Sequence, residues 1–140
     1  MSYTTLTSDP DRPSTRAALL YAAMTANFTR TLLAPDARPI VPAGTIVNVN
    51  YAAARFPDGA CTSASDFKYV FTRLYRNTGE EDVATCGSTA LPDERAVIGA
   101  GCFASVTVMN ATTKGDVSAD VQALVLERLT PSGILTCFDA

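Results

Sequence analysis

"GCFASVTVMNATTKGDVSADVQALVLERL", residues 101–129, joins a strand pattern to a helix pattern through a single turn, and it decides the fold class. Apolar and polar residues alternate over about 102–109, which predicts a half-buried β-strand. The side chains expected to face the core are those of Ala104, Val106 and Val108. The intervening residues Ser105 and Thr107 are expected to face solvent.

The second half of this stretch predicts an amphipathic helix. After the turn "TTKGD", either Asp116 or Ser118 can cap a helix that runs to about Leu129. Its apolar residues recur at helical spacing and are Val117, Val121, Leu124, Val125 and Leu129. We expect this helix to pack over the core-facing side of the preceding strand.

The remainder of the chain adds one helix and several strands. Residues 1–13 are polar and interrupted by prolines, so they are expected to form a flexible arm. A helix capped by Ser14 is expected to end near Leu33. Further strands are expected at 45–51, at 66–76, briefly near Cys86, and at 134–138. Residues 88–95 are expected to be a loop.

These elements predict one α+β domain over residues 14–140. Its sheet is expected to be mainly antiparallel, with two helices packed on it and two disulfides. The bonds follow from four cysteines, Cys61, Cys86, Cys102 and Cys137, in a chain without histidine or a CxxC motif, which argues against zinc. Of the three ways of pairing them, we favour Cys61–Cys86 with Cys102–Cys137. The alternative is four reduced, buried thiols in a cytosolic protein.

Two N-glycosylation sequons favour export. Asn27-Phe28-Thr29 and Asn110-Ala111-Thr112 both match the acceptor pattern. Asn27 lies within an expected helix, a poor place for a glycan, whereas Asn110 lies where a strand enters a turn. Together with the even number of cysteines, the sequons predict a secreted, extracellular glycoprotein.

Composition argues against several kinds of partner. The formal net charge is −3, and the two lysines and nine arginines are scattered, so we expect binding neither to nucleic acid nor to an anionic membrane. No apolar run approaches the roughly 20 residues that span a bilayer. The apolar run 17–26 is expected to belong to a core helix, because the acidic and proline-rich residues before it are not typical of a signal peptide.

The sequence predicts neither a catalytic constellation nor a metal or cofactor site. Without histidine there is no serine–histidine or cysteine–histidine nucleophile, and no phosphate-binding or dinucleotide motif occurs. The acidic run "GEED", residues 79–82, could hold the two carboxylates of a small glycoside hydrolase. A solvated turn is the interpretation that we favour for it.

The strand expected at 66–76 offers a candidate binding face. Period two places Phe67, Tyr69, Phe71, Arg73 and Tyr75 on one side. If this row faces the core, Arg73 needs a buried partner. If it faces solvent, it is a surface for a glycan, a partner protein or a second copy of the chain. Asn48 and Asn50, on one face of the strand at 45–51, could hydrogen-bond hydroxyl groups.

The stretch from 101 to 129, followed by "TCF", resembles small cysteine-stapled secreted fungal proteins. Some of these stand alone as effectors, and others are appended to secreted carbohydrate-active enzymes. A strand that begins at a cysteine, followed by a turn and an amphipathic helix, is also similar to the pattern of killer-toxin-like effectors. The resemblance implies a secreted, non-catalytic protein and assigns no catalytic residue.

The sequence therefore predicts a secreted binding protein or module that recognises a glycan or a partner protein through an exposed sheet face. Its candidate ligand-binding residues are Tyr69, Phe71, Arg73, Tyr75, Asn48 and Asn50. A toxin-like effector that acts by protein–protein contact is the alternative, and a carboxylate-based glycoside hydrolase is the further one.

Overall fold

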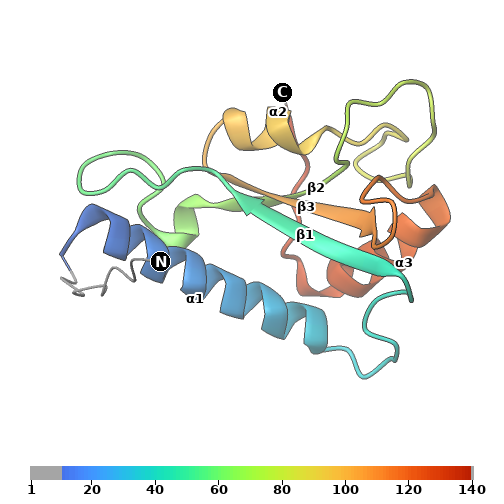
Figure 1. Ribbon diagram of the computed structural model, residues 1–140, viewed down its shortest axis with the longest axis horizontal. Helices are drawn as coiled ribbons and strands as arrows, with labels where there is room; N and C mark the ends of the chain where they lie inside the picture. Colours follow the sequence, from blue (N-terminus) through green and yellow to red (C-terminus); the bar gives the residue numbers. More distant parts are fainter. Residues whose placement is uncertain (1–10, 140) are drawn as a thin grey trace, which may run out of the picture.

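A computed structural model describes residues 11–139 (Figure 1). The helices are α1 (Pro13–Leu33), α2 (Glu94–Gly99) and α3 (Ala119–Leu129), and the strands are β1 (Thr45–Tyr51), β2 (Lys68–Thr72) and β3 (Phe103–Asn110). Short 3₁₀ turns, η1 (Ala64–Asp66) and η2 (Thr130–Ser132), precede β2 and follow α3. The fold is α+β, as predicted. Most of the predicted flexible arm lies outside the described residues.

The three strands form a mixed sheet in the order β1-β3-β2. β1 and β3 are antiparallel, whereas β2 and β3 are parallel. The expectation of a mainly antiparallel sheet with two helices is therefore wrong. The cause is α2, a crossover helix that the sequence analysis does not predict and whose first two residues fall in the loop expected at 88–95. Asp93 caps it by accepting a hydrogen bond from the Ala96 N–H at 2.8 Å.

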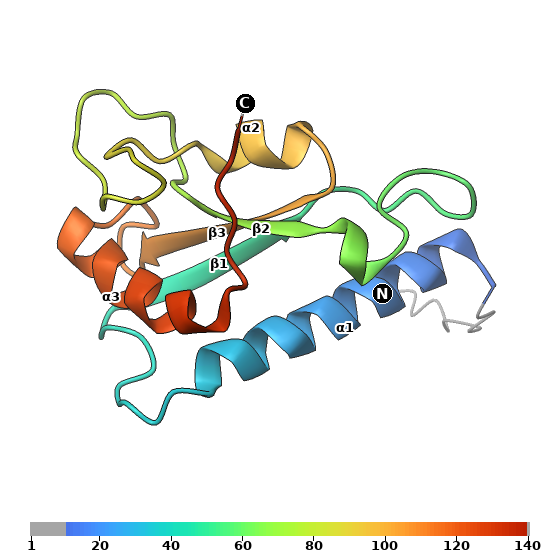
Figure 2. The same ribbon diagram turned by 180° about the vertical axis from the view of Figure 1, so that it is seen from behind.

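Helices cover both faces of the sheet. α1 and α3 lie against one face and α2 lies against the other (Figures 1 and 2). Val106 and Val108 are buried in the core with Val125 and Leu129 of α3, as predicted. Ser105 and Thr107, expected to face solvent, are completely buried instead, because α2 covers their side of β3. The three residues at the centre of this core face are Ala104, Val106 and Val108.

Helix α1 begins two residues before the predicted start, with Arg12 rather than Ser14 at the N-cap position, and ends where predicted. Pro13 occupies its first turn, where a missing N–H costs nothing, and no side chain caps it. Its buried residues are Met24 and Phe28, and Phe28 stacks on Tyr69 at 5.6 Å between ring centroids. This contact holds the long helix against β2.

Two predicted strands shrink to single bridges. The predicted strand near Cys86 is only a bridge between Thr85 and Ser88, and the predicted terminal strand is one parallel bridge between Leu135 and Tyr69. The strand predicted at 66–76 is reduced to β2. The tail from Ile134 onward therefore meets β2 at this bridge and crosses the strand without extending the sheet (Figure 2).

The two predicted disulfides are present, but the predicted pairing is wrong. The bonds join Cys61 to Cys102 and Cys86 to Cys137, with Cα–Cα distances of 5.3 and 5.7 Å. Parallel neighbours begin at the same edge of a sheet, so the segments that precede β2 and β3 lie together and bring Cys61 beside Cys102. The loop after β2 meets the tail, and this contact pairs the other two cysteines.

Candidate binding pocket beside β2

A cavity of about 310 Å³ opens beside β2, on the side away from β3. Its walls come from four segments: Val70 and Phe71 of β2, residues 85–92, the end of α3 with η2, and tail residues 135–138. None of the described residues that line it is charged, and hydroxyl groups of serine and threonine lie among the apolar side chains. Its volume is at the lower end of the range, about 300–1,000 Å³, that is usual for small-ligand sites.

The backbone of β2 forms the floor of this pocket. The Lys68 N–H donates to the Cys102 carbonyl at 3.0 Å, so the peptide groups of alternate residues, starting at Lys68, point toward β3. Those of Tyr69, Phe71 and Arg73 point outward, to the open edge. Phe71 is the residue of this outward set that the pocket exposes to its interior.

Both neighbours of Phe71 on this edge are already hydrogen-bonded. The Tyr69 carbonyl accepts from the Thr136 N–H at 2.8 Å. Arg73 donates its N–H to the Pro92 carbonyl at 3.0 Å and accepts from the Glu94 N–H at 2.9 Å. Between these two contacts, the N–H and C=O of Phe71 have no hydrogen-bond partner among residues 11–139. The pocket therefore contains one unused donor–acceptor pair.

A buried ion pair fixes the loop that forms one wall. Arg73 and Asp82 are each only 5% exposed, and one guanidinium nitrogen of Arg73 donates to both carboxylate oxygens at 3.0 Å. The Asp82 carboxylate also accepts from the Leu91 N–H at 2.9 Å. Arg73 thus has the buried partner that its inward position requires, and the pair anchors Leu91 at the rim of the pocket.

Two further side chains complete this polar network. Gln122 of α3 donates to Asp82 at 2.9 Å and accepts from the Val83 N–H at 2.7 Å. Asp116 accepts from the N–H groups of Leu74 and Tyr75, at 2.6 and 3.1 Å. The loop that follows β2 is therefore held by hydrogen bonds at both of its ends, at Leu74 and Tyr75 and at Val83.

The predicted aromatic row is mostly core. Phe67, Tyr69 and Phe71 are buried, whereas Tyr75 lies beyond the end of β2 and is 64% exposed. Burial raises the pKa of the Tyr69 hydroxyl well above its usual value, and nearby Tyr51 raises it further. The Tyr69 hydroxyl donates to the Met24 carbonyl at 3.4 Å. An exposed aromatic sheet face is thus not formed.

Asn48 and Asn50 face α2 and are half-buried. The Asn48 amide donates to the Glu94 carboxylate at 3.2 Å, and the Thr107 hydroxyl donates to the same oxygen at 3.2 Å. This contact fastens α2 to the sheet. The sequence analysis missed Glu94 because it placed residues 88–95 in a loop. The Ser105 hydroxyl in the same layer is buried without a hydrogen-bond partner among the described residues.

The other candidate residues lie away from the pocket. Asn27 is exposed on α1, and Asn110 ends β3, where its side-chain oxygen accepts from the N–H groups of Thr112 and Thr113. Glu80 and Glu81 are exposed and line no cavity that includes the β2 edge. Within residues 11–139 no group of acidic, cysteine or histidine side chains has the arrangement of a metal site.

The pocket itself was not predicted, because its walls come from segments that are distant in sequence and meet only through the parallel β2–β3 pair. The one available signal was the cysteine pairing. Had Cys86–Cys137 been chosen, the tail would have been placed against the loop after β2.

No protein family, no curated protein and no solved structure matches this chain. In the described part of the chain no helix is both long enough and apolar enough to cross a membrane. The chemistry of the pocket is therefore the main basis for a functional hypothesis.

Proposed function

We propose that this chain is a secreted, non-catalytic binding protein that holds part of a partner protein in the pocket beside β2. The observation that carries the proposal is the pocket itself: concave, uncharged, mainly apolar, and built on a rigid strand with a free backbone pair. Such a site can bind and orient a ligand, and the described residues that line it include no carboxylate, amine or imidazole that could activate its serine and threonine hydroxyls.

Two observations support an oxidising, extracellular location. All four cysteines are paired in the described residues, and disulfides persist mainly in secreted proteins. Asn110 is the half-buried last residue of β3 and is followed by an exposed turn at 112–114, a kind of position where a glycan could be attached.

A partner protein is favoured over a glycan. The glycan hypothesis relied on an exposed row of aromatic rings, and three of those rings are in the core. The hydrolase hypothesis relied on Glu80 and Glu81, which lie on an exposed loop outside the pocket. The toxin-like alternative also acts by protein contact, so the same surface would serve it.

Ligand titration followed by amide NMR tests the binding function. The probes are an apolar capped amino acid, N-acetyl-L-leucine N′-methylamide, and an uncharged sugar, methyl β-glucoside. Binding of either probe should shift the amide signals of Val70, Leu91 and Leu135, which line the pocket. If neither probe shifts these signals up to its solubility limit, the pocket is not a binding site and the proposed function is wrong.

Substitutions at exposed alanines provide the matched control. Ala90→Trp places a large side chain at the rim of the pocket, whereas Ala26→Trp makes the same change on the exposed face of α1. The first substitution should abolish probe binding and the second should preserve it. Binding that survives Ala90→Trp would place the site elsewhere.

A further inference from the structure

The edge of β2 has one unfilled position. Phe71 is 4% exposed, and its outward N–H and C=O lie between the Thr136 contact and the Pro92 and Glu94 contacts. Backbone groups that are buried without a partner are rare in native proteins, because they lose their hydration without gaining a hydrogen bond. A ligand that supplies one acceptor and one donor at this position relieves that penalty.

Extended peptide chemistry matches this pair. In an antiparallel hydrogen-bonded pair, two residues exchange both of their N–H···O=C bonds, so one residue of a partner suffices to satisfy Phe71. A sugar hydroxyl can also donate and accept, but it does not carry an apolar side chain that would fill the rest of the cavity. The uncharged walls disfavour a charged peptide terminus, which would lose its hydration without gaining an ion pair.

We propose that the pocket binds a single uncharged, apolar residue of a peptide in extended conformation, which exchanges both backbone hydrogen bonds with Phe71. The inference rests on the proposed binding function and names its ligand class. The apolar side chain of that residue lies between Leu91 and the tail residue Leu135, both of which line the cavity.

The two flanking contacts limit how the peptide enters. Tyr69 and Arg73 are four residues apart on β2, roughly 13 Å at the usual rise of a strand, and each is occupied by a segment of this chain. A long strand cannot continue past both. The partner therefore presents the tip of a loop, with the bound residue entering from the open side of the pocket.

The decisive experiment compares two probes that differ by one hydrogen-bond donor. N-acetyl-L-leucine N′-methylamide keeps the leucine N–H, and the analogue methylated at that nitrogen lacks it. We expect the first probe to shift the Phe71 amide signal and slow its hydrogen exchange. The methylated analogue should bind at least about tenfold more weakly, as expected when one buried hydrogen bond is lost.

The outcomes separate this inference from the binding function. Equal affinity of the two probes would show apolar binding without backbone pairing, which overturns the inference and leaves the function standing. Binding of methyl β-glucoside alone would overturn both the inference and the proposed partner-protein function, in favour of a glycan. If the Phe71 amide signal shifts when only the protein concentration is raised, a second copy of the chain occupies the pocket. That result would overturn the inference that a peptide binds there. If no probe shifts the amide signals of the pocket residues, both proposals are wrong.

The free protein offers an independent check. In the absence of a probe, the Phe71 amide should exchange with solvent deuterium faster than the amides of Val70 and Thr72, which point into the sheet. Ala90→Trp should remove the slowing that the first probe causes, and Ala26→Trp should retain it. Equal protection of the three amides in the free protein would mean that Phe71 already has a partner.

Discussion

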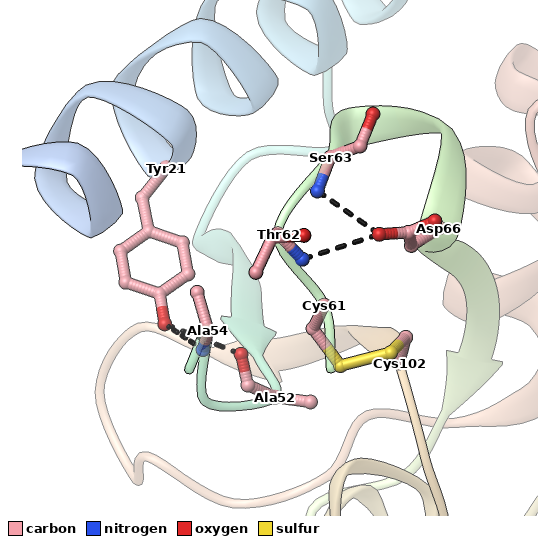
Figure 3. Close-up of a disulfide and its surroundings, with 8 residues drawn as sticks. All are labelled: Tyr21, Ala52, Ala54, Cys61, Thr62, Ser63, Asp66 and Cys102. Atoms are coloured by element: carbon pink, nitrogen blue, oxygen red, sulfur yellow. Dashed lines mark hydrogen bonds between the residues drawn. A yellow bond between two sulfur atoms is a disulfide. The ribbon is translucent and has the colours of Figure 1, made fainter. Parts of the chain in front are cut away.

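The two ends of β2 are fastened by different means. At its start, the Cys61–Cys102 bond lies against the core, with Cys61 only 6% exposed (Figure 3). Asp66 adds a capping box there by accepting from the N–H groups of Thr62 and Ser63. At its other end, a buried ion pair fixes the loop from inside, while the second disulfide, between Cys86 and Cys137, is exposed.

This difference separates scaffold from site. The first end holds the sheet together and contributes nothing to the pocket. The second end forms the pocket, because Cys86 and Cys137 both line it and their bond ties the loop after β2 to the tail. The disulfide at the first end is therefore part of the buried scaffold, whereas the disulfide at the second end is accessible and lies beside the candidate pocket.

The largest expected effect comes from removing the ion pair at the second end. Arg73→Leu leaves Asp82 buried without its countercharge and should lower the free energy of unfolding by about 3–5 kcal/mol. Urea titration measures the change. Arg76→Leu is the control, since Arg76 is exposed, and it should stay within about 0.5 kcal/mol. An equally small effect of both would mean that the pair does not anchor the loop.

The two disulfides should differ in how they are reduced. Their sequence separations, 41 and 51 residues, predict similar losses of stability, about 4 kcal/mol each, from unfolded-state entropy. Access distinguishes them, because a reducing thiolate must reach a sulfur atom. Under a mild reductant, alkylation and mass spectrometry should find Cys86 and Cys137 labelled before Cys61 and Cys102. Labelling in the reverse order would contradict the assignment of the interior bond to the core.

The smallest effect concerns the middle of β2 and alkaline pH. Because the pKa of Tyr69 is raised in the folded state, its contribution to stability is complete below the usual tyrosine value of about 10 and is lost as the pH rises above it. Tyr69→Phe should therefore make the alkaline loss of stability shallower, as measured by urea midpoints on both sides of that pH. Tyr75→Phe, at an exposed position, should leave the loss unchanged.

The sequence predicted the elements better than their arrangement. Hydrophobic periodicity placed α1, β1, β3 and α3 closely, because each has one clear apolar face. Hydrophobic periodicity did not predict α2, because six residues are too few to show a helical period. Without this crossover helix, β2 was expected to be antiparallel to β3, whereas the two strands are parallel. The wrong disulfide pairing and the solvent-facing placement of Ser105 and Thr107 followed from it.

The candidate site was harder to predict for a similar reason. Residue type identified Arg73 and the aromatic row, and the need for a buried partner was foreseen if the row faced inward. The partner, Asp82, comes from a loop whose position no local pattern specifies. The role proposed for Phe71 depends on its backbone N–H and C=O. The identity of a residue does not show whether these groups have a hydrogen-bond partner.

The position of β3 also bears on how the chain folds. Among the strands of residues 11–139, both edge strands have β3 as their sheet partner, and β3 is synthesised after β1, β2 and α2. On a ribosome, the first two strands therefore emerge without a sheet partner, and their pairing must wait for a distant segment. Such non-local contacts slow folding and leave apolar strands exposed to aggregation in the interval. The long helix α1, completed first, is the element able to shelter their aromatic side chains during that wait.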